Sequence, residues 1–398
     1  MKTACVVIGA NYGDEGKGQC THNTCLDLNS GSDTLVVRYN GGAQAGHTVY
    51  TENHRHVFQH IGSGTFTGAH TWLSDEFISN PLIFRTEFET LKKIGVTPCV
   101  AVSPKSRVTT PYDMLVNILR ESQRGSAKHG SCGCGINETI QRNKRVSLTV
   151  NDLKPLVDDY QQYREFMQTL LLDALDQSTD ILGYHAAEFE RDILDPFYED
   201  MCFFVENTTV IDWLILDSYT NVVFESAQGL LLDEKYGVAP HLTPSSVGLE
   251  TPVMYMNKAL ISDDIDVSDI NCQVYYLSRA YMTRHGAGEF AYEVDKSYLG
   301  VDNPNETNVY NDNQGQFRYG LLDVNALVDR CTVDFLNNTN ERVKQPGLNI
   351  WFNIVTTCFN QLPEIFPVII DQKEYKVRVE TLQHFISSRA PTRKDHLC

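Results

Sequence analysis

The stretch that decides the fold is Ala4-Cys-Val-Val-Ile-Gly9, a short apolar run rich in β-branched residues that ends at a glycine. A run of this length and composition predicts a buried parallel strand. Gly9-Ala-Asn-Tyr-Gly-Asp-Glu-Gly-Lys-Gly18 follows at once and predicts a glycine-rich turn that leads into a helix. Thr34-Leu-Val-Val-Arg-Tyr39 repeats the strand pattern and is followed by a second turn, Asn40-Gly-Gly-Ala-Gln-Ala-Gly-His47.

The same alternation continues along the chain. Helical periodicity is present at 82–94, 114–119 and 153–175, and apolar runs at 99–102, 222–224 and 274–277 favour strands. Alternating strands and helices predict an α/β fold with a large, mainly parallel central sheet and flanking helices, and with ligands at the carboxyl ends of the strands. We expect residues 1–398 to form a single domain, because apolar segments continue on both sides of turn-rich stretches such as 300–316. A division into two domains remains the alternative on length alone.

Composition excludes several classes of protein. The chain has 398 residues, of which 42% are hydrophobic and 21% are charged, so it is neither disordered nor collagen-like. The net charge of −18 argues against binding to a nucleic acid polymer or to an anionic membrane. No apolar run is long enough to span a membrane, and the first residues lack the pattern of a signal peptide. We therefore expect a cytoplasmic protein.

The 11 cysteines show no framework spacing, and we expect no disulfides. Cys20, His22 and Cys25 could be imagined as zinc ligands, but no second ligand pair follows at the spacing of a zinc finger. Cys132 and Cys134 belong to the glycine-rich run Gly130-Ser-Cys-Gly-Cys-Gly135, which favours a loop over a redox pair.

The turn after the first strand is typical of a P-loop-like phosphate loop. Its glycines allow close approach of the backbone, its amides can point at an anion, and Lys17 can neutralise the charge. It departs from the Walker pattern, since Asn11 occupies the first glycine position and Gly18 replaces the hydroxyl residue that binds magnesium. Asp14 offers the missing oxygen ligand. Taken alone, such a loop is as compatible with a packing role as with phosphate binding.

Three segments in order resolve this ambiguity. Asn11 to Gly18, then Val37-Arg-Tyr-Asn-Gly-Gly-Ala-Gln-Ala-Gly-His-Thr48, then Phe224-Glu-Ser-Ala-Gln-Gly-Leu-Leu-Leu-Asp233 resemble the adenylosuccinate synthetase family, whose members join aspartate to a purine nucleotide. Gly130–Ile136 is similar to that family's Gly-Thr-Thr-Gly-Arg-Gly-Ile loop. Arg279-Ala-Tyr-Met-Thr-Arg-His-Gly-Ala-Gly288 is similar to its Lys/Arg-Ala-Tyr-Thr-Thr-Arg-Val-Gly segment. The resemblance covers nearly the whole chain.

The resemblance implies roles for three side chains. Asp14 removes the proton from purine N1, so that O6 attacks the γ-phosphate of a nucleoside triphosphate, and the amine of aspartate then displaces the new phosphate. A carboxylate with a reference pKa of about 3.9 is a weak base, so the charge developing on O6 must be stabilised, for which Gln228 is the candidate donor. His47 can donate to the transferring phosphoryl oxygens. Taken one at a time, these residues have simpler interpretations: Asp14 as a helix cap, His47 as a loop histidine with its hydrogen bonds satisfied, and Gln228 as a surface amide.

The resemblance also implies binding residues. Magnesium would be held by Asp14 and the carbonyl of Gly46. We expect the nucleotide and phosphate contacts to come from Asn11, Gly13, Glu15, Gly16, Lys17, Gly18, Gln44, Ser131, Cys132, Arg145, Thr243 and Pro391. We expect the aspartate contacts to come from Gln314, Gly315, Gln316 and Arg318. A homodimer is implied, in which Arg145 supplies a phosphate contact from the neighbouring subunit.

The sequence departs from the family at the nucleotide sites. No Lys-x-Asp occurs, and the matching segment Leu348-Asn-Ile-Trp-Phe-Asn-Ile-Val-Thr-Thr357 has no carboxylate to select guanine, which favours ATP or dATP as the donor. Gln316 replaces the first arginine of the aspartate loop, and Cys132 and Cys134 replace a threonine and an arginine. These changes resemble the phage branch, 2-aminoadenylosuccinate synthetase, which acts on dGMP. Some phage members replace the catalytic aspartate with serine, whereas Asp14 is retained here.

The sequence thus predicts a magnesium-dependent ligase that joins L-aspartate to dGMP with ATP, giving N6-succinyl-2-amino-2′-deoxyadenylate for 2-aminoadenine DNA. The alternative is adenylosuccinate synthetase using IMP and GTP. A second alternative is an inactive nucleotide-binding module. We expect five cationic side chains to converge on the bound anions, although ordinary surface ion pairs are the simpler interpretation of each: Lys17, Arg38, Arg145, Arg284 and Arg318.

Overall fold

The computed structural model describes residues 1–125, 130–131, 133–178, 180, 190–262, 267–304, 306, 315–340 and 343–390. Its centre is an eight-stranded sheet in the order β15-β11-β1-β10-β2-β5-β7-β9. Every neighbouring pair is parallel, which confirms the predicted α/β fold with a parallel central sheet. The strands are β1 (Thr3–Gly9), β2 (Thr34–Arg38), β5 (His70–Leu73), β7 (Val100–Val102), β9 (Thr209–Val210), β10 (Asn221–Gly229), β11 (Ile270–Arg279) and β15 (Leu348–Thr357).

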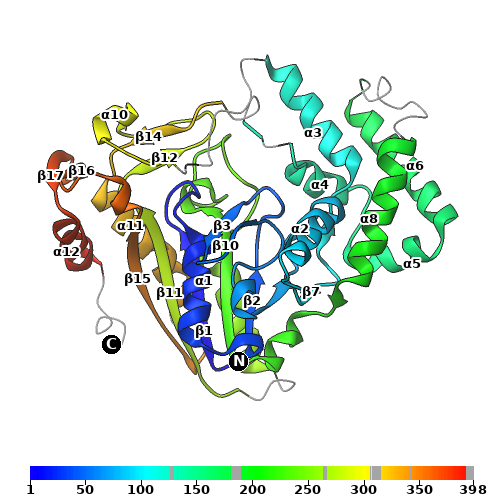
Figure 1. The fold of residues 1–398 in the computed structure, drawn as a ribbon, viewed down its shortest axis with the longest axis horizontal. Helices are drawn as coiled ribbons and strands as arrows, with labels where there is room; N and C mark the ends of the chain where they lie inside the picture. Colours follow the sequence, from blue (N-terminus) through cyan, green and yellow to red (C-terminus); the bar gives the residue numbers. More distant parts are fainter. Residues whose placement is uncertain are drawn as a thin grey trace.

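Side chains of β1 alternate between two buried layers. Ala4, Val6 and Ile8 belong to one hydrophobic core with residues of α9 (Glu250–Ile261) and α11 (Val324–Thr339). Cys5 and Val7 belong to a second core with Cys25 of α1 (Lys17–Leu28). Helices thus cover both faces of the sheet (Figure 1), which explains why β1 is apolar at nearly every position.

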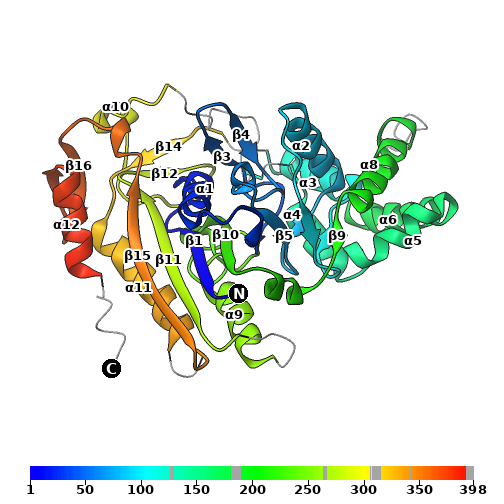
Figure 2. The same ribbon diagram turned by 60° about the horizontal axis from the view of Figure 1, so that its bottom comes forward.

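A group of helices packs beside the β7–β9 end of the sheet (Figure 2). A separate hydrophobic core joins α2 (Pro81–Lys93), α3 (Pro111–Arg124), α5 (Leu153–Asp158), α6 (Tyr160–Gln177) and α8 (Asp195–Glu206), and α4 (Ile136–Asn143) packs against α3. The single helix predicted over 153–175 is wrong, because Asp159 has an extended backbone (φ −134°) between α5 and α6. Its carboxylate accepts hydrogen bonds from the backbone of Gln161 and Gln162 and begins a new helix.

Smaller elements surround the carboxyl ends of the central strands. They are the hairpin of β3 (His47–Tyr50) and β4 (Arg55–Phe58), and the sheet of β12 (Met282–Arg284), β13 (Glu293–Val294) and β14 (Arg318–Gly320). Further along the chain come β16 (Phe366–Ile370), β17 (Lys373–Val377) and α12 (Val379–Arg389). The described cysteines are free thiols. None of the helices that the structure describes has the length and apolar character needed to cross a membrane.

Candidate functional site

The phosphate loop joins β1 to α1, and its own charged side chains form hydrogen bonds with its backbone. Glu15 accepts hydrogen bonds from the amides of Asn11 (3.1 Å) and Gly13 (2.9 Å). Lys17 donates to the carbonyl of Gly13 (2.5 Å) and lies 3.5 Å from the Glu15 carboxylate. Burial raises the pKa of Glu15. Gly13 (φ +113°) and Gly16 (φ +87°) adopt left-handed conformations that favour glycine, and Gly16 is the N-cap of α1.

Arg330 of α11 supports this loop from behind. Its Nε donates to the carbonyl of Ala10 (2.7 Å), and its Nη2 donates to the side chain of Asn11. Asn11 in turn donates to Ser278 at the end of β11 (2.8 Å). Asn11, expected to contact the nucleotide, therefore uses its side chain to fix the loop. Sequence reasoning missed Arg330, since a single arginine in an amphipathic helix gives no signal of a long-range contact.

The next two loop residues are held from two further strands. Arg279, at the end of β11, donates through Nε to the carbonyl of Asp14. Thr357, at the end of β15, donates to the carbonyl of Glu15 (2.9 Å). With its backbone fixed in this way, the Asp14 side chain remains about one quarter exposed. The loop therefore presents its one accessible carboxylate at the carboxyl end of the sheet.

Gln228 lies against the residue that precedes Asp14. It lies within β10, where the pairing with β1 is irregular, and has a left-handed backbone (φ +65°). A Cβ placed on Gly13 would be 3.2 Å from Cα and 3.4 Å from Oε1 of Gln228, which is a tight contact, so a glycine at position 13 eases the approach of the two segments. At Gly229 a Cβ would come within 2.4 Å of the Asn11 carbonyl. These two glycines bring Gln228 against the phosphate loop.

His47 is buried and held by Glu225 of β10. Its Nδ1 is 2.7 Å from the Glu225 carboxylate, and its Nε2 is buried without a hydrogen-bond partner. Burial and the charge of Arg38 lower the pKa of His47 to about 4, so the neutral ring donates from Nδ1 and leaves Nε2 bare.

Glu225 keeps its charge in this buried position. Burial alone would raise its pKa, but His47, Arg38 and hydrogen bonds from Ser63 lower it to about 2. Arg38, fully buried at the end of β2, lies 3.8 Å from Glu225 and has no hydrogen-bond partner on any guanidinium nitrogen. Sequence reasoning missed Glu225, although it stands three residues before Gln228 in the segment that carries the family resemblance.

Gly18 places His47 beside the start of α1. A Cβ on Gly18 would be 2.8 Å from Cβ of His47 and 3.1 Å from Oγ of Ser63, so only glycine allows this approach. Gly46, the predicted magnesium contact, is exposed and directly precedes His47. The loop, α1 and the start of β3 thus meet at one place.

Gln44 and Thr243 lie in segments that adjoin β10. Both amide atoms of Gln44 are buried without a hydrogen-bond partner, and its Nε2 lies near Gly41, which packs against Ala227. The loop of Thr243 is tied to the same region, because Asn40 donates both to Ser245 (3.1 Å) and to the carbonyl of Ala227 (3.2 Å). These segments meet beside Ala227, the residue before Gln228.

Ser131 and Arg145 lie on the helical side of the molecule. Ser131 donates to Asn117 of α3 (2.7 Å). Arg145, just after α4, pairs with Asp173 of α6 through two nitrogens (2.6 and 2.8 Å), on a partly exposed surface. Arg145 therefore belongs to the helical group and not to the cluster at the phosphate loop, and its contact from a neighbouring subunit remains a prediction. Cys132, Gln314 and Pro391 lie outside the described residues.

Arg318 is already paired. Its Nε and Nη2 donate to Glu293 (2.8 and 2.5 Å), and its Nη1 donates to the carbonyls of Gly286 (3.2 Å) and Gly288 (2.9 Å). Gly315 has a left-handed backbone (φ +74°), and the next residue, Gln316, is exposed. An incoming carboxylate would therefore compete with Glu293 for the Arg318 guanidinium.

The five cations expected to converge are divided among three places. Lys17 and Arg38 lie near His47, since both positive charges lower its pKa after the larger effect of burial. Arg284 and Arg318 hold the loop after β12, through the carbonyls of Glu289 and Gly288. Arg145 lies apart from both groups, so the five cations do not meet within one chain, and their convergence with Arg145 supplied by a second subunit remains a prediction.

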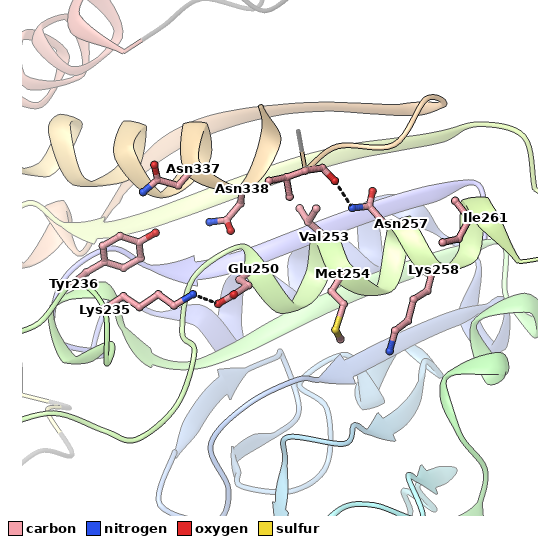
Figure 3. A pocket seen from close by; sticks show the side chains of 11 residues that line it. Lys235, Tyr236, Glu250, Val253, Met254, Asn257, Lys258, Ile261, Asn337 and Asn338 are labelled. Carbon is pink, nitrogen blue, oxygen red and sulfur yellow. Dashed lines mark hydrogen bonds and ion pairs between the residues drawn. The ribbon is translucent and has the colours of Figure 1, made fainter. Parts of the chain in front are cut away.

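A groove of about 640 Å³ lies elsewhere, between α9 and α11 (Figure 3). Its walls include the ion pair of Lys235 with Glu250 and the apolar side chains of Met254 and Ile261. None of the predicted site residues that the structure describes lines this groove. The part of the chain that the structure describes contains no group of three His, Cys, Asp or Glu side chains suited to a metal ion. The chemistry-bearing side chains gather at the phosphate loop instead.

Comparison with known proteins finds matches in one family. A model of the adenylosuccinate synthetase family matches residues 6–340. The adenylosuccinate synthetase of Lactobacillus acidophilus is 31% identical over 301 residues, which cover 73% of this chain and 65% of that protein. The enzyme of Thermosynechococcus vestitus is 32% identical over 301 residues, covering 73% and 62%. The chain thus spans less than two thirds of the length of these curated relatives.

Two solved structures share the fold. Fully ligated adenylosuccinate synthetase from Plasmodium falciparum superimposes with a TM-score of 0.67 at 18% identity, covering 92% of this chain and 79% of that one. Succinoaminodeoxyadenylate synthetase of cyanophage S-2L, bound to dGMP and to dATP as an energy donor, gives 0.60 at 14% identity and covers 99% and 97%. On the match over residues 6–340, the chain belongs to the adenylosuccinate synthetase family.

Proposed function

We propose that this protein is a carbon–nitrogen ligase that joins L-aspartate to C6 of a purine nucleoside monophosphate at the expense of a nucleoside triphosphate. One observation supports this most directly. Around the phosphate loop, buried polar atoms lack hydrogen-bond partners, namely Nε2 of His47 and both amide atoms of Gln44. Buried polar groups are normally satisfied, so a polar ligand that completes these contacts is the simplest account.

The proposed first step uses the side chains that meet at the loop. Asp14 accepts the N1 proton of the purine, and the amide of Gln228 stabilises the negative charge that develops on O6. O6 then attacks the γ-phosphorus, and the bond from that phosphorus to the bridging oxygen of the donor breaks. His47 faces the transferring group through Nε2, while Glu225 fixes the orientation of the ring.

The second step replaces the new leaving group. The amine of aspartate attacks C6, inorganic phosphate leaves with the former O6, and the amine loses a proton. Phosphorylation is what makes this substitution possible, because phosphate leaves a purine ring far more readily than hydroxide. Arg318 would bind a carboxylate of aspartate by releasing Glu293.

Oxygen donors at the loop suit magnesium. The Asp14 carboxylate and the Gly46 carbonyl are hard ligands on accessible residues, and Mg²⁺ commonly takes only one or two protein oxygens beside phosphates and water. When bound, the ion would neutralise charge on the triphosphate. Lys17 and the backbone amides of the loop serve the same end from the protein.

The nucleotide pair that we favour is dGMP with ATP or dATP. The segment that aligns with the guanine-selecting motif forms β15, whose last residue, Thr357, touches the phosphate loop, yet Leu348–Thr357 contains no carboxylate. The likeness in fold to the cyanophage enzyme bound to dGMP and dATP is compatible with this choice. The product would be N6-succinyl-2-amino-2′-deoxyadenylate. IMP with GTP is the rival pair, supported by the names of the curated relatives.

The test is phosphate release by purified protein with magnesium and aspartate, comparing dGMP with ATP against IMP with GTP. We expect turnover with the first pair, dependent on aspartate and lost in Asp14→Asn. Turnover with the second pair alone would refute the choice of dGMP. Binding of nucleotides without turnover by either pair would instead establish an inactive nucleotide-binding module.

A further inference from the structure

His285 lies next to the proposed base. It follows β12 directly, and its Nε2 is 3.8 Å from Oδ2 of Asp14. Its ring packs on Phe317, with centroids 4.5 Å apart and planes inclined by 44°. In the segment that resembles the family's Arg-Val-Gly, this chain has Arg284-His285-Gly286, so an imidazole stands where the family has an apolar side chain.

The loop that holds His285 is fixed against the phosphate loop. The Arg284 guanidinium lies 4.5 Å from the ring centre of Tyr12, and Tyr12 Oη donates to the carbonyl of Glu289 (3.3 Å). Arg284 donates to the same carbonyl. The two loops are thus joined two residues before Asp14, and the distance from His285 to Asp14 follows from packed contacts.

The surroundings of the ring indicate which nitrogen bears the proton. Nδ1 is buried without a hydrogen-bond partner, whereas Nε2 faces a carboxylate. A buried N–H without an acceptor is rarer than an unfilled acceptor, so the neutral ring favours its proton on Nε2. Hydrogen bonds at catalytic groups are often long before substrate binds, and a small rotation of the Asp14 side chain would bring its Oδ2 within hydrogen-bonding distance of this Nε2–H.

We infer that His285 is a positioning residue for Asp14. By donating from Nε2 to Oδ2 it leaves Oδ1 turned toward the purine N1 proton. Phe317 keeps the ring in place and connects it to the segment of Arg318, which is the predicted aspartate site. This inference rests on the proposed function, and it adds to that function a group that orients the base.

Two substitutions separate this role from simple packing. The Nε2 amide of glutamine can occupy the place of the histidine Nε2–H, whereas asparagine is too short to reach it. We expect His285→Gln to keep most of kcat, and His285→Asn and His285→Val to lower kcat by about 10 to 100-fold. KM for ATP should change little in all three. Thermal melting would show that the variants remain folded.

A second readout does not depend on turnover. In protein labelled with ¹⁵N-histidine, His285→Gln identifies the His285 resonances by their loss. Asp14→Asn should then shift the Nε2 resonance of His285 in the otherwise unchanged protein. An unshifted resonance, or equal kcat for the Gln and Asn variants, would overturn the inference. A shifted resonance in a protein that turns over neither nucleotide pair would support the pairing and refute the proposed reaction.

Discussion

At the scale of single residues, the buried trio of Arg38, Glu225 and His47 determines which groups of the site are charged and which nitrogen of His47 bears the proton. Glu225 is ionised because a cation, an imidazole and a hydroxyl surround it, and its charge holds the His47 proton on Nδ1. Nε2 is therefore an unprotonated acceptor in the free protein, buried without a hydrogen-bond partner. An anionic phosphoryl group would favour protonation of Nε2 and convert it into a donor.

The low pKa of His47 predicts a pH dependence of stability. The folded-state pKa is about 4, below the unfolded reference of about 6.5, so the unfolded chain binds more protons between these values. The associated stability is complete above about pH 6.5 and is lost as the pH falls toward 4, by on the order of 3 kcal/mol. In urea unfolding, His47→Asn should lose less stability than the wild type over this pH range, because its amide does not titrate and can still donate to Glu225. The same dependence of the unfolding free energy on pH in both proteins would contradict this prediction.

The pairing of Arg318 with Glu293 predicts opposite effects of two substitutions on aspartate binding. Glu293→Gln should lower KM for aspartate by up to about fivefold, because an ion pair of this exposure contributes about 1 kcal/mol or less. Arg318→Ala should raise KM by more than about tenfold, since it removes a charged hydrogen-bond donor. Steady-state kinetics at saturating nucleotide measures both. A rise in KM for Glu293→Gln would show that the pair serves the loop structure alone.

At the scale of elements, α1 begins where the phosphate loop ends, and its first turn is packed against β3. Gly18 is the point of contact with His47, and Lys17 turns back to the carbonyl of Gly13. The start of the helix therefore presents backbone amides to the site and at the same time fixes the position of the histidine. A substitution in this turn would therefore alter both the backbone amides and the position of His47.

Gly18→Ala is the test of this contact. Alanine in a helix is favoured over glycine by about 1 kcal/mol, but overpacking at 2.8 Å from His47 costs about 1 to 3 kcal/mol. We expect a net loss of stability, and a fall in kcat of about 100-fold because His47 must move. Asn23→Ala, at an exposed position of the same helix, is the matched control and should do neither. A Gly18→Ala protein as active as wild type would show that this contact does not require glycine.

At the scale of the molecule, the sheet order brings the site together. β1 lies between β10 and β11, and β2 lies beside β10. Residues 14, 38, 225 and 279 thereby come from neighbouring strand ends, although they span most of the sequence. Arg145 stands outside this cluster, in the helical group beside the β7–β9 end.

That separation predicts complementation between inactive chains. If Arg145 acts on the site of a second subunit, Arg145→Ala and Asp14→Ala should each lack activity as pure proteins. After mixing and subunit exchange, about a quarter of wild-type activity should return, since half of the dimers are hybrid and each hybrid has one intact site. Phosphate release measured before and after exchange tests this. No recovery from demonstrably exchanged dimers would place Arg145 outside the reaction.

The sequence by itself determined the parallel α/β fold and the position of the phosphate loop, because buried strands and glycine turns have local signatures. The runs at 222–224 and 274–277 lie within β10 and β11, and the run at 99–102 overlaps β7, which begins at Val100. The short strands β5 and β9 gave no comparable signal, since the paired backbone of a few residues depends on its neighbours. The break between α5 and α6 was missed because apolar periodicity continues across Asp159.

Only the tertiary structure decided which side chains face one another. Glu225, Arg330 and His285 are separated by 178, 319 and 271 positions from His47, Asn11 and Asp14, respectively, and spacing in sequence says nothing about such contacts. The same holds for the commitment of Arg318 to Glu293. Burial and charge pairing depend on distance in space, which the order of strands in the sheet fixes and local sequence does not.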